Sequence, residues 1–189
     1  MKKYRVNEIF YTLQGEGLYT GTPMVFVRFS GCNRSCPFCD TDFTEFETIT
    51  AEEIVAETQK YPTERVVLTG GEPLLQTDDE LIKKLHAAGL KIHIETNGTL
   101  RIPEGIDHVV CSPKDEIPAI QPNAVDEVKI VYQGQPTEEL EKIGRFFPFT
   151  RYFYLQPCSC INIGETVEKV KELKGWRLSL QTHKLIDIK

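Results

Sequence analysis

The stretch Met24-Val25-Phe26-Val27-Arg28-Phe29-Ser30-Gly31-Cys32 joins an apolar run directly to a glycine and a cysteine. Residues 24–29 are β-branched, aromatic or otherwise apolar apart from one arginine, which is the composition of a β-strand. Three cysteines lie in the loop that follows, over residues 31–40. In α/β barrels the loops after the strands carry the active site. The sequence therefore predicts a reactive loop at the carboxyl end of the first long strand.

Further apolar runs and helix signals recur outward from this stretch. Thr50 opens a capping box with Glu53, and Asp78 opens an acidic first helical turn. Thr137 and Gly164 begin two more segments with helical character. Strands are also expected at residues 66–68, 91–94, 107–110, 128–132, 152–155 and 177–180.

Strands that alternate with helices indicate βαβ units and a largely parallel sheet. Two connections, 98–105 and 112–125, are too short or too rich in proline to hold a helix. A complete eightfold barrel typically needs about 250 residues, and this chain has 189. The predicted fold is an α/β, incomplete, open-sided parallel (β/α) barrel of about six core strands with few helices, forming a single domain over residues 1–189.

Composition and charge narrow the class of partner. The formal net charge is −6, the isoelectric point is near 5.3, and no run of lysine and arginine stands out. A general nucleic-acid binder usually carries a basic patch, and a membrane span needs roughly 20 apolar residues in a row. Six cysteines without a secretory signal favour a reducing compartment. We expect a cytoplasmic protein that acts on a small molecule, not on nucleic acid or membrane.

The cysteines at 32, 36 and 39 have the spacing of a metal-binding loop. Soft thiolate ligands select iron–sulfur clusters or zinc, and a structural zinc site takes four ligands, typically from paired hooks. The remaining cysteines, Cys111, Cys158 and Cys160, lack such spacing and are expected to be buried free thiols. Three ligands suit a 4Fe–4S cluster with one open iron. A non-catalytic zinc module remains the alternative.

A second motif follows the strand at 66–68. Gly70-Gly71-Glu72-Pro73 brings two glycines to the end of that strand. Glycine lets a backbone approach a ligand closely, so its carbonyls and amides can hold an amino-acid head group.

These motifs together resemble the radical S-adenosylmethionine (SAM) superfamily, whose signature is C-x3-C-x2-C with an aromatic residue before the last cysteine. Residues 8–17, Arg28, residues 39–41 and residues 181–184 sharpen the resemblance to the 7-carboxy-7-deazaguanine synthases. Those enzymes convert 6-carboxy-5,6,7,8-tetrahydropterin to 7-carboxy-7-deazaguanine and ammonia, on the route to queuosine. A glycyl-radical activase, which shares the cysteine triplet, is the rival enzyme.

The resemblance implies a role for each matching residue. Substrate binding falls to Leu13, Gln14, Gly15, Arg28, Thr69, Glu95, His183 and Lys189. The residues implied to bind the cofactor are Phe38, Cys39, Asp40, Gly71, Ser112, Pro113, Lys114, Gln156, Pro157, Cys158 and Ser159. The implied ligands of the cluster are Cys32, Cys36 and Cys39, and the implied ligand of Mg²⁺ is Thr41.

The chemistry of these side chains agrees with the implied roles. A carboxylate such as Glu95 accepts a bidentate pair from the adjacent N–H donors of a pyrimidine edge, and the Arg28 fork matches a carboxylate. Mg²⁺ prefers hard oxygen ligands such as the Thr41 hydroxyl. An electron donor such as flavodoxin or ferredoxin, and a homodimer, are also implied.

Overall fold

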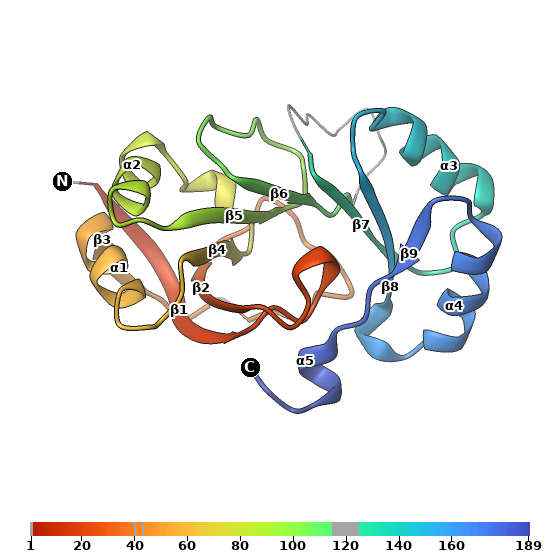
Figure 1. Cartoon of the computed structure of the whole chain (residues 1–189), viewed down its shortest axis with the longest axis horizontal. Coiled ribbons are helices and arrows are strands. Elements are labelled where there is room, and N and C mark those ends of the chain that lie inside the picture. The colour runs from red at the N-terminus through yellow and green to blue at the C-terminus, as the bar shows by residue number, and fades with distance from the viewer. Residues whose placement is uncertain (1, 40, 43, 115–124) are drawn as a thin grey trace.

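The computed structural model describes residues 2–39, 41, 42, 44–114 and 125–189. Its strands form one open sheet in the order β3-β1-β2-β4-β5-β6-β7-β8-β9 (Figure 1). From β2 to β9 each strand is parallel to its neighbour, and β1 and β3 add an antiparallel edge. The strands are β1 Lys3–Leu13, β2 Pro23–Phe29, β3 Glu47–Thr50, β4 Arg65–Gly70, β5 Lys91–Thr96, β6 His108–Cys111, β7 Glu127–Tyr132, β8 Tyr152–Pro157 and β9 Trp176–Leu178. The predicted open-sided, mostly parallel architecture is confirmed.

Few helices accompany this sheet. Helices α1 and α2 lie together near one end of the molecule, and α3 and α4 lie near the other (Figure 1). They are α1 Ala51–Thr58, α2 Asp79–Ala87, α3 Thr137–Phe146, α4 Ile163–Glu172 and the short α5 Thr182–Leu185. No helix among the described residues is long and apolar enough to cross a membrane.

Side-chain chemistry explains where two of these helices begin. The Thr50 side chain accepts from the Glu53 backbone N–H while the Glu53 carboxylate accepts from the Thr50 backbone, so the predicted capping box is present. Asp78 caps α2 by accepting from the Leu81 N–H at 3.0 Å. Beyond the end of α2, Gly89 has φ +79°, a conformation that glycine adopts without strain.

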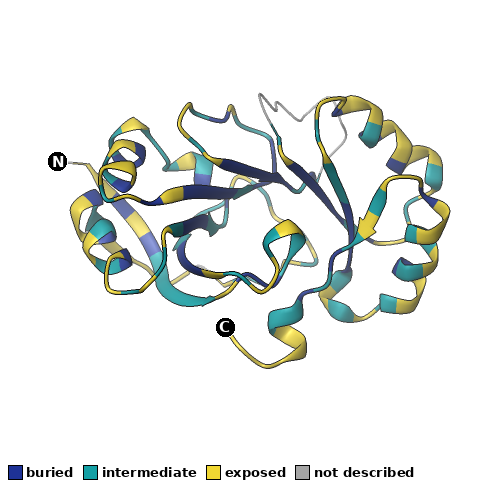
Figure 2. Ribbon diagram, in the orientation of Figure 1, coloured by how far each residue is buried: buried dark blue, intermediate teal, exposed yellow. Residues whose placement is uncertain are grey.

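Along the parallel strands, successive side chains point to opposite faces of the sheet. Their outward residues form two apolar clusters under the helices, and much of the central sheet is buried (Figure 2, dark blue). The first cluster includes Phe29 and Leu68 with Leu81 of α2. The second includes Ile130 and Leu155. The inward face is left free for a small apolar patch and for the polar side chains described below.

The sequence predicted the parallel strands but missed both strands of the antiparallel edge. In β1 the pairing with β2 shifts register between Val6 and Glu8, so the strict alternation that reveals a strand is broken. β3 spans four exposed or half-buried residues and has no apolar face. The connection 98–105 holds no helix, as predicted. The connection 112–125 lies mostly outside the described residues.

Candidate active site

A cavity of about 690 Å³ opens at the carboxyl ends of the parallel strands. The residues that line it come from β1, from the C-terminal segment and from most of the strands between them. Of the residues predicted for the site, the wall contains Leu13, Gln14, Gly15, Arg28, Cys32, Cys36, Phe38, Cys39, Thr41, Thr69, Gly71, Glu95, Ser112, Lys114, Gln156, Pro157, Cys158, Ser159, His183 and Lys189. Pro113 is buried and is not among the lining residues. Asp40 lies outside the described residues.

The cysteine loop follows β2, as the sequence predicted. A turn in which the Cys39 N–H donates to the Cys36 carbonyl at 3.1 Å brings these two residues together. The Arg34 N–H lies 3.4 Å from Cys32 Sγ, and burial raises the pKa of the Cys32 thiol. The described part of the chain has no group of three His, Cys, Asp or Glu residues that could hold a metal ion. The three thiols are therefore not gathered around a common point in this structure, but all of them line one open cavity, and soft thiolates are the ligands that an iron–sulfur cluster selects.

The two glycines after β4 lie against this loop. A Cβ on Gly71 would stand 2.0 Å from the Gly31 carbonyl oxygen, and one on Gly70 would stand 2.1 Å from that of Phe29. Hydrogen bonds from the Gly71 N–H to Phe29 and from the Glu72 N–H to Gly31 join the two segments at 3.1 and 3.0 Å. The absence of side chains therefore lets the turn pack directly on the cysteine loop, while Gly71 still lines the cavity.

Glu72, the residue after the two glycines, holds the same turn in place through hydrogen bonds of its side chain. Its side chain is completely buried and accepts from the Asn97 N–H, the Leu74 N–H and the Thr96 hydroxyl at 2.8–3.0 Å. Burial raises its pKa, and these three donors act in the opposite direction. The carboxylate thus ties the end of β4 to the end of β5. The sequence motif contained Glu72 but gave it no role.

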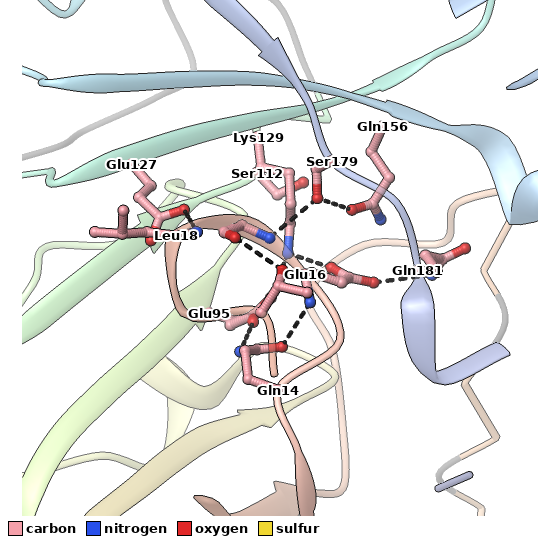
Figure 3. A network of polar contacts seen from close by, with 12 residues as sticks. Gln14, Glu16, Leu18, Glu95, Ser112, Glu127, Lys129, Gln156, Ser179 and Gln181 are labelled. Atoms are coloured by element: carbon pink, nitrogen blue, oxygen red, sulfur yellow. Dashed lines mark hydrogen bonds and ion pairs between the residues drawn. The ribbon is translucent and has the colours of Figure 1, made fainter. Parts of the chain in front are cut away.

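A polar network fills the centre of the cavity floor (Figure 3). Glu95 accepts from Gln14 Nε2 at Oε1 (3.0 Å) and from Lys129 Nζ at Oε2 (2.8 Å). Lys129 also pairs with Glu16, whose other oxygen accepts from Gln181 Nε2 at 2.9 Å. The side chain of Lys129 is only 4% exposed. One buried ammonium is therefore shared between two carboxylates.

Glu16 and Lys129 each stabilise the charged form of the other. Burial raises the pKa of Glu16, but the charge and hydrogen bond of Lys129 outweigh it and hold that pKa below its usual value. Burial lowers the pKa of Lys129, yet Glu16 and Glu95 together hold it well above its usual value. For both Glu16 and Lys129 the charges and hydrogen bonds outweigh burial, so the net shift favours the ionised form.

Side chains at the ends of β6, β8 and β9 border the network. Lys114 Nζ donates to Ser112 Oγ at 2.6 Å and lies 5.6 Å from the centre of the Phe38 ring. Burial, with the nearby charge of Lys129, lowers the pKa of Lys114. On the other side, Ser179 Oγ donates to Gln156 Oε1 at 3.0 Å (Figure 3).

Arg28 is already paired at the rim of the cavity. Its Nε donates to Glu8 Oε1 at 2.9 Å, and Lys189 Nζ reaches the other Glu8 oxygen at 2.5 Å. The backbone carbonyl of Lys189 accepts from the Thr12 hydroxyl at 2.8 Å, which holds the chain end along β1. Glu8 thus gathers two cations on one wall of the site.

The C-terminal segment closes against the loop after β1. The Gly15 carbonyl accepts from both the N–H and the hydroxyl of Thr182 at 2.9 Å. A Cβ on Gly15 would lie 2.0 Å from His183 Nδ1. A side chain at position 15 would force the His183 ring to move from its place in the cavity wall.

The remaining cysteines are free, as predicted, but their predicted burial is only partly correct. Cys111 is buried, and burial raises its pKa to about 12. Cys158 and Cys160 are only half-buried, because the turn they form sits at the rim. Ser159 and Cys160 have φ of +46° and +61°, a conformation that side chains rarely adopt. Cys158 and Ser159 line the cavity.

Several site residues escaped the sequence prediction, among them Glu8, Glu16, Lys129 and Gln181. The signal for Lys129 was present in Glu127-Val128-Lys129-Ile130-Val131-Tyr132. Period-two alternation places Val128, Ile130 and Tyr132 on one face, and they are indeed in the second apolar cluster. The same rule places Lys129 inside the barrel, where a charge needs a partner.

Comparisons with known proteins agree with this geometry. The model of the radical SAM superfamily matches residues 26–118. A 7-carboxy-7-deazaguanine synthase of Bacteroides thetaiotaomicron is 54% identical, over 98% of each chain. One of Caulobacter vibrioides is 41% identical over 98% of this chain and 99% of that relative. The crystal structure of QueE from Escherichia coli superposes with a TM-score of 0.77 at 26% identity, covering 94% of this chain and 93% of that one.

The matches to these relatives and to the solved structure span nearly the full length of both partners. The chain belongs to the 7-carboxy-7-deazaguanine synthase family of radical SAM enzymes.

Proposed function

We propose that this enzyme converts 6-carboxy-5,6,7,8-tetrahydropterin to 7-carboxy-7-deazaguanine with loss of ammonia. The observation that carries the proposal is the union, in one cavity, of three cysteines with a carboxylate, an arginine and a histidine. The rival glycyl-radical activase acts on a protein and has no need of a floor built from Gln14 and Glu95.

Cys32, Cys36 and Cys39 would hold the 4Fe–4S cluster, with Gly71, Ser112, Lys114 and Gln156 beside SAM. When bound, this pair supplies the one-electron chemistry that makes a carbon radical. The protein's own part is to orient the ligands and exclude water. Because the glycine turn packs directly on the cysteine loop, the residues that would hold SAM lie next to those that would hold the cluster.

Glu95 would accept hydrogen bonds from the pyrimidine edge of the pterin. A carboxylate has about four lone-pair sites, and Gln14 and Lys129 each occupy one. Sites therefore remain on both oxygens for substrate donors. Arg28 would pair with the substrate carboxylate, and its bond to Glu8 holds the guanidinium at the rim.

Mg²⁺ would bind near Thr41, which lines the same cavity. A threonine hydroxyl is a hard oxygen ligand, and Mg²⁺ commonly keeps several waters and completes its shell with substrate oxygens. The proposal also includes an electron donor such as flavodoxin or ferredoxin and a homodimeric assembly.

The test is to reconstitute the protein anaerobically and incubate it with the pterin, SAM and dithionite. Mass spectrometry should detect 7-carboxy-7-deazaguanine, and turnover should rise when Mg²⁺ is added. Cleavage of SAM without consumption of the pterin would assign the site to another substrate. A colourless protein that binds zinc in place of iron would favour the non-catalytic module.

A further inference from the structure

Lys129 occupies an unusual place for a lysine, inside the barrel on a strand whose other face is core. It lies on β7, whereas its partner Glu95 lies on β5, and β6 separates the two strands. Its second partner, Glu16, comes from the loop after β1. The ammonium therefore joins three separate parts of the chain (Figure 3), and all three residues line the cavity.

This contact fixes the plane of the Glu95 carboxylate. Lys129 bonds Oε2 at 2.8 Å and Gln14 bonds Oε1 at 3.0 Å, so neither oxygen can rotate away without losing a charged hydrogen bond. Gln14 is itself held, because its Oε1 accepts from the Glu16 N–H at 3.1 Å. The carboxylate is thereby oriented from two sides by the protein.

The charge balance matters as much as the geometry. Glu16 and Glu95 are two anions beside one cation, and without the cation two partly buried carboxylates would lie close together with no positive charge between them. The other titratable groups nearest the network are Lys114 after β6, His183 of α5, His93 of β5, His108 of β6 and Glu127 of β7. Among these, Lys114 is hydrogen-bonded to Ser112 and His108 to Glu127.

We propose that Lys129 is a positioning residue that orients Glu95 for the donor-rich edge of the substrate ring and neutralises Glu16 beside it. This inference rests on the proposed function. A purely structural brace between strands would affect stability alone. A positioning role would affect substrate binding selectively and would make that binding sensitive to pH.

The principal variant is Lys129→Met, with Lys129→Arg as the conservative replacement. Lys169→Met, which removes a lysine paired with Glu172 on α4, is the matched control. In Lys129→Met, Glu16 loses its cation and its pKa rises, so a proton replaces the ammonium as pH falls. Pterin affinity at pH 8 should therefore drop about tenfold or more, and the deficit should shrink at pH 6. SAM affinity should stay within about twofold, as it should in Lys169→Met.

The double variant Lys129→Met/Glu16→Gln keeps the test valid if the single variant folds poorly. This variant removes the negative charge of Glu16 together with the positive charge of Lys129. The fold should therefore recover, and pterin affinity should no longer depend on pH. Lys129→Arg should retain most of the pterin affinity, since arginine keeps the charge.

Calorimetric titration with the pterin and with SAM separately gives both affinities, and circular dichroism reports the fold. Equal weakening of both ligands, or unchanged pterin affinity in a folded Lys129→Met protein, would overturn the positioning role. If the wild-type enzyme neither binds nor converts the pterin, the proposed function fails first and the inference falls with it.

Discussion

At the scale of single residues, the geometry of the site depends on two glycines, which have no side chain to hold neighbouring atoms apart. Gly71 and Gly15 each lie where a Cβ would meet another atom at 2.0 Å, the first against the cysteine loop and the second against His183. At Gly71 the atom is a backbone oxygen, so a side chain there requires the backbone to move, whereas at Gly15 it belongs to the His183 ring, which would have to turn away. Gly71 thus fixes how near the glycine turn comes to the cysteine loop, and Gly15 fixes the orientation of His183.

Gly71→Ala should therefore reduce cluster incorporation. The new methyl group would displace Gly31 and the adjacent Cys32, so the three thiols would no longer face the cavity together. Gly144→Ala is the matched control, because nothing lies within 4 Å of its Cβ position on α3, and alanine in a helix is favoured over glycine by about 1 kcal/mol. Iron per chain after anaerobic reconstitution should fall in the first variant and stay unchanged in the second. Equal iron in both would refute the packing argument.

Glu95→Gln should weaken the pterin about tenfold or more. The amide keeps the shape of the carboxylate but has one oxygen, and both protein partners, Gln14 and Lys129, are donors. Whichever way the amide turns, its NH₂ faces a donor, and a buried unpaired group costs about 1–3 kcal/mol. SAM affinity should change little. Glu141→Gln, on the exposed face of α3, is the control; weakening of SAM to the same degree would place Glu95 in the cofactor site.

At the scale of elements, what the sequence predicted depended on how regular each pattern was. The parallel strands and the capped helices were predictable because alternation and capping are local signals. β1 was missed because its bulge breaks the alternation, and α5 because four residues carry no period. The cysteine loop was predictable from spacing alone. The Lys129 network was not found, because it joins β5, β7 and the loop after β1, which are distant in sequence.

A buried histidine of β5 predicts how the stability of the fold depends on pH. His93 of β5 packs against Tyr19 and His108 at 4.6 and 5.0 Å between ring centres, and burial, with the charge of His108, lowers its pKa to about 3. The unfolded chain protonates histidine near pH 6.5. Between these values the unfolded state binds a proton that the folded state does not, so stability falls as pH falls.

The free energy of unfolding should thus decrease by up to about 1.4 kcal/mol per pH unit from this group below pH 6.5. His93→Phe keeps the ring contact and removes the titration, so urea denaturation between pH 6.5 and 4.5 should show a shallower slope. His86→Gln, on the partly exposed surface of α2, should alter the slope less. A slope that His93→Phe leaves unchanged would mean that other groups set the acid sensitivity.

At the scale of the whole molecule, the sheet has few paired residues between β6 and β7 among the residues that the structure describes. Two apolar clusters lie on its outer face, one under α1 and α2 and one with residues of α3. Between them, the described residues of β6 and β7 share only the pairs Val110–Glu127 and Cys111–Val128. The cysteine loop and glycine turn follow strands of the first half, whereas Lys129 and Gln156 belong to the second. The active site therefore spans two parts that can differ in local stability.

A pair of leucine variants tests this division. Leu81 of α2 and Leu140 of α3 are both completely buried, one in each cluster, and leucine-to-alanine changes in a core cost about 2–5 kcal/mol. Leu81→Ala loosens the half that carries the cysteines, so iron should be lost to a chelator faster than from the wild type. Leu140→Ala should retain iron but bind the pterin and SAM more weakly, because the strands bearing Lys129 and Gln156 open more often. Iron loss at the same rate from both variants, at matched stability in urea, would show that the sheet opens as one unit.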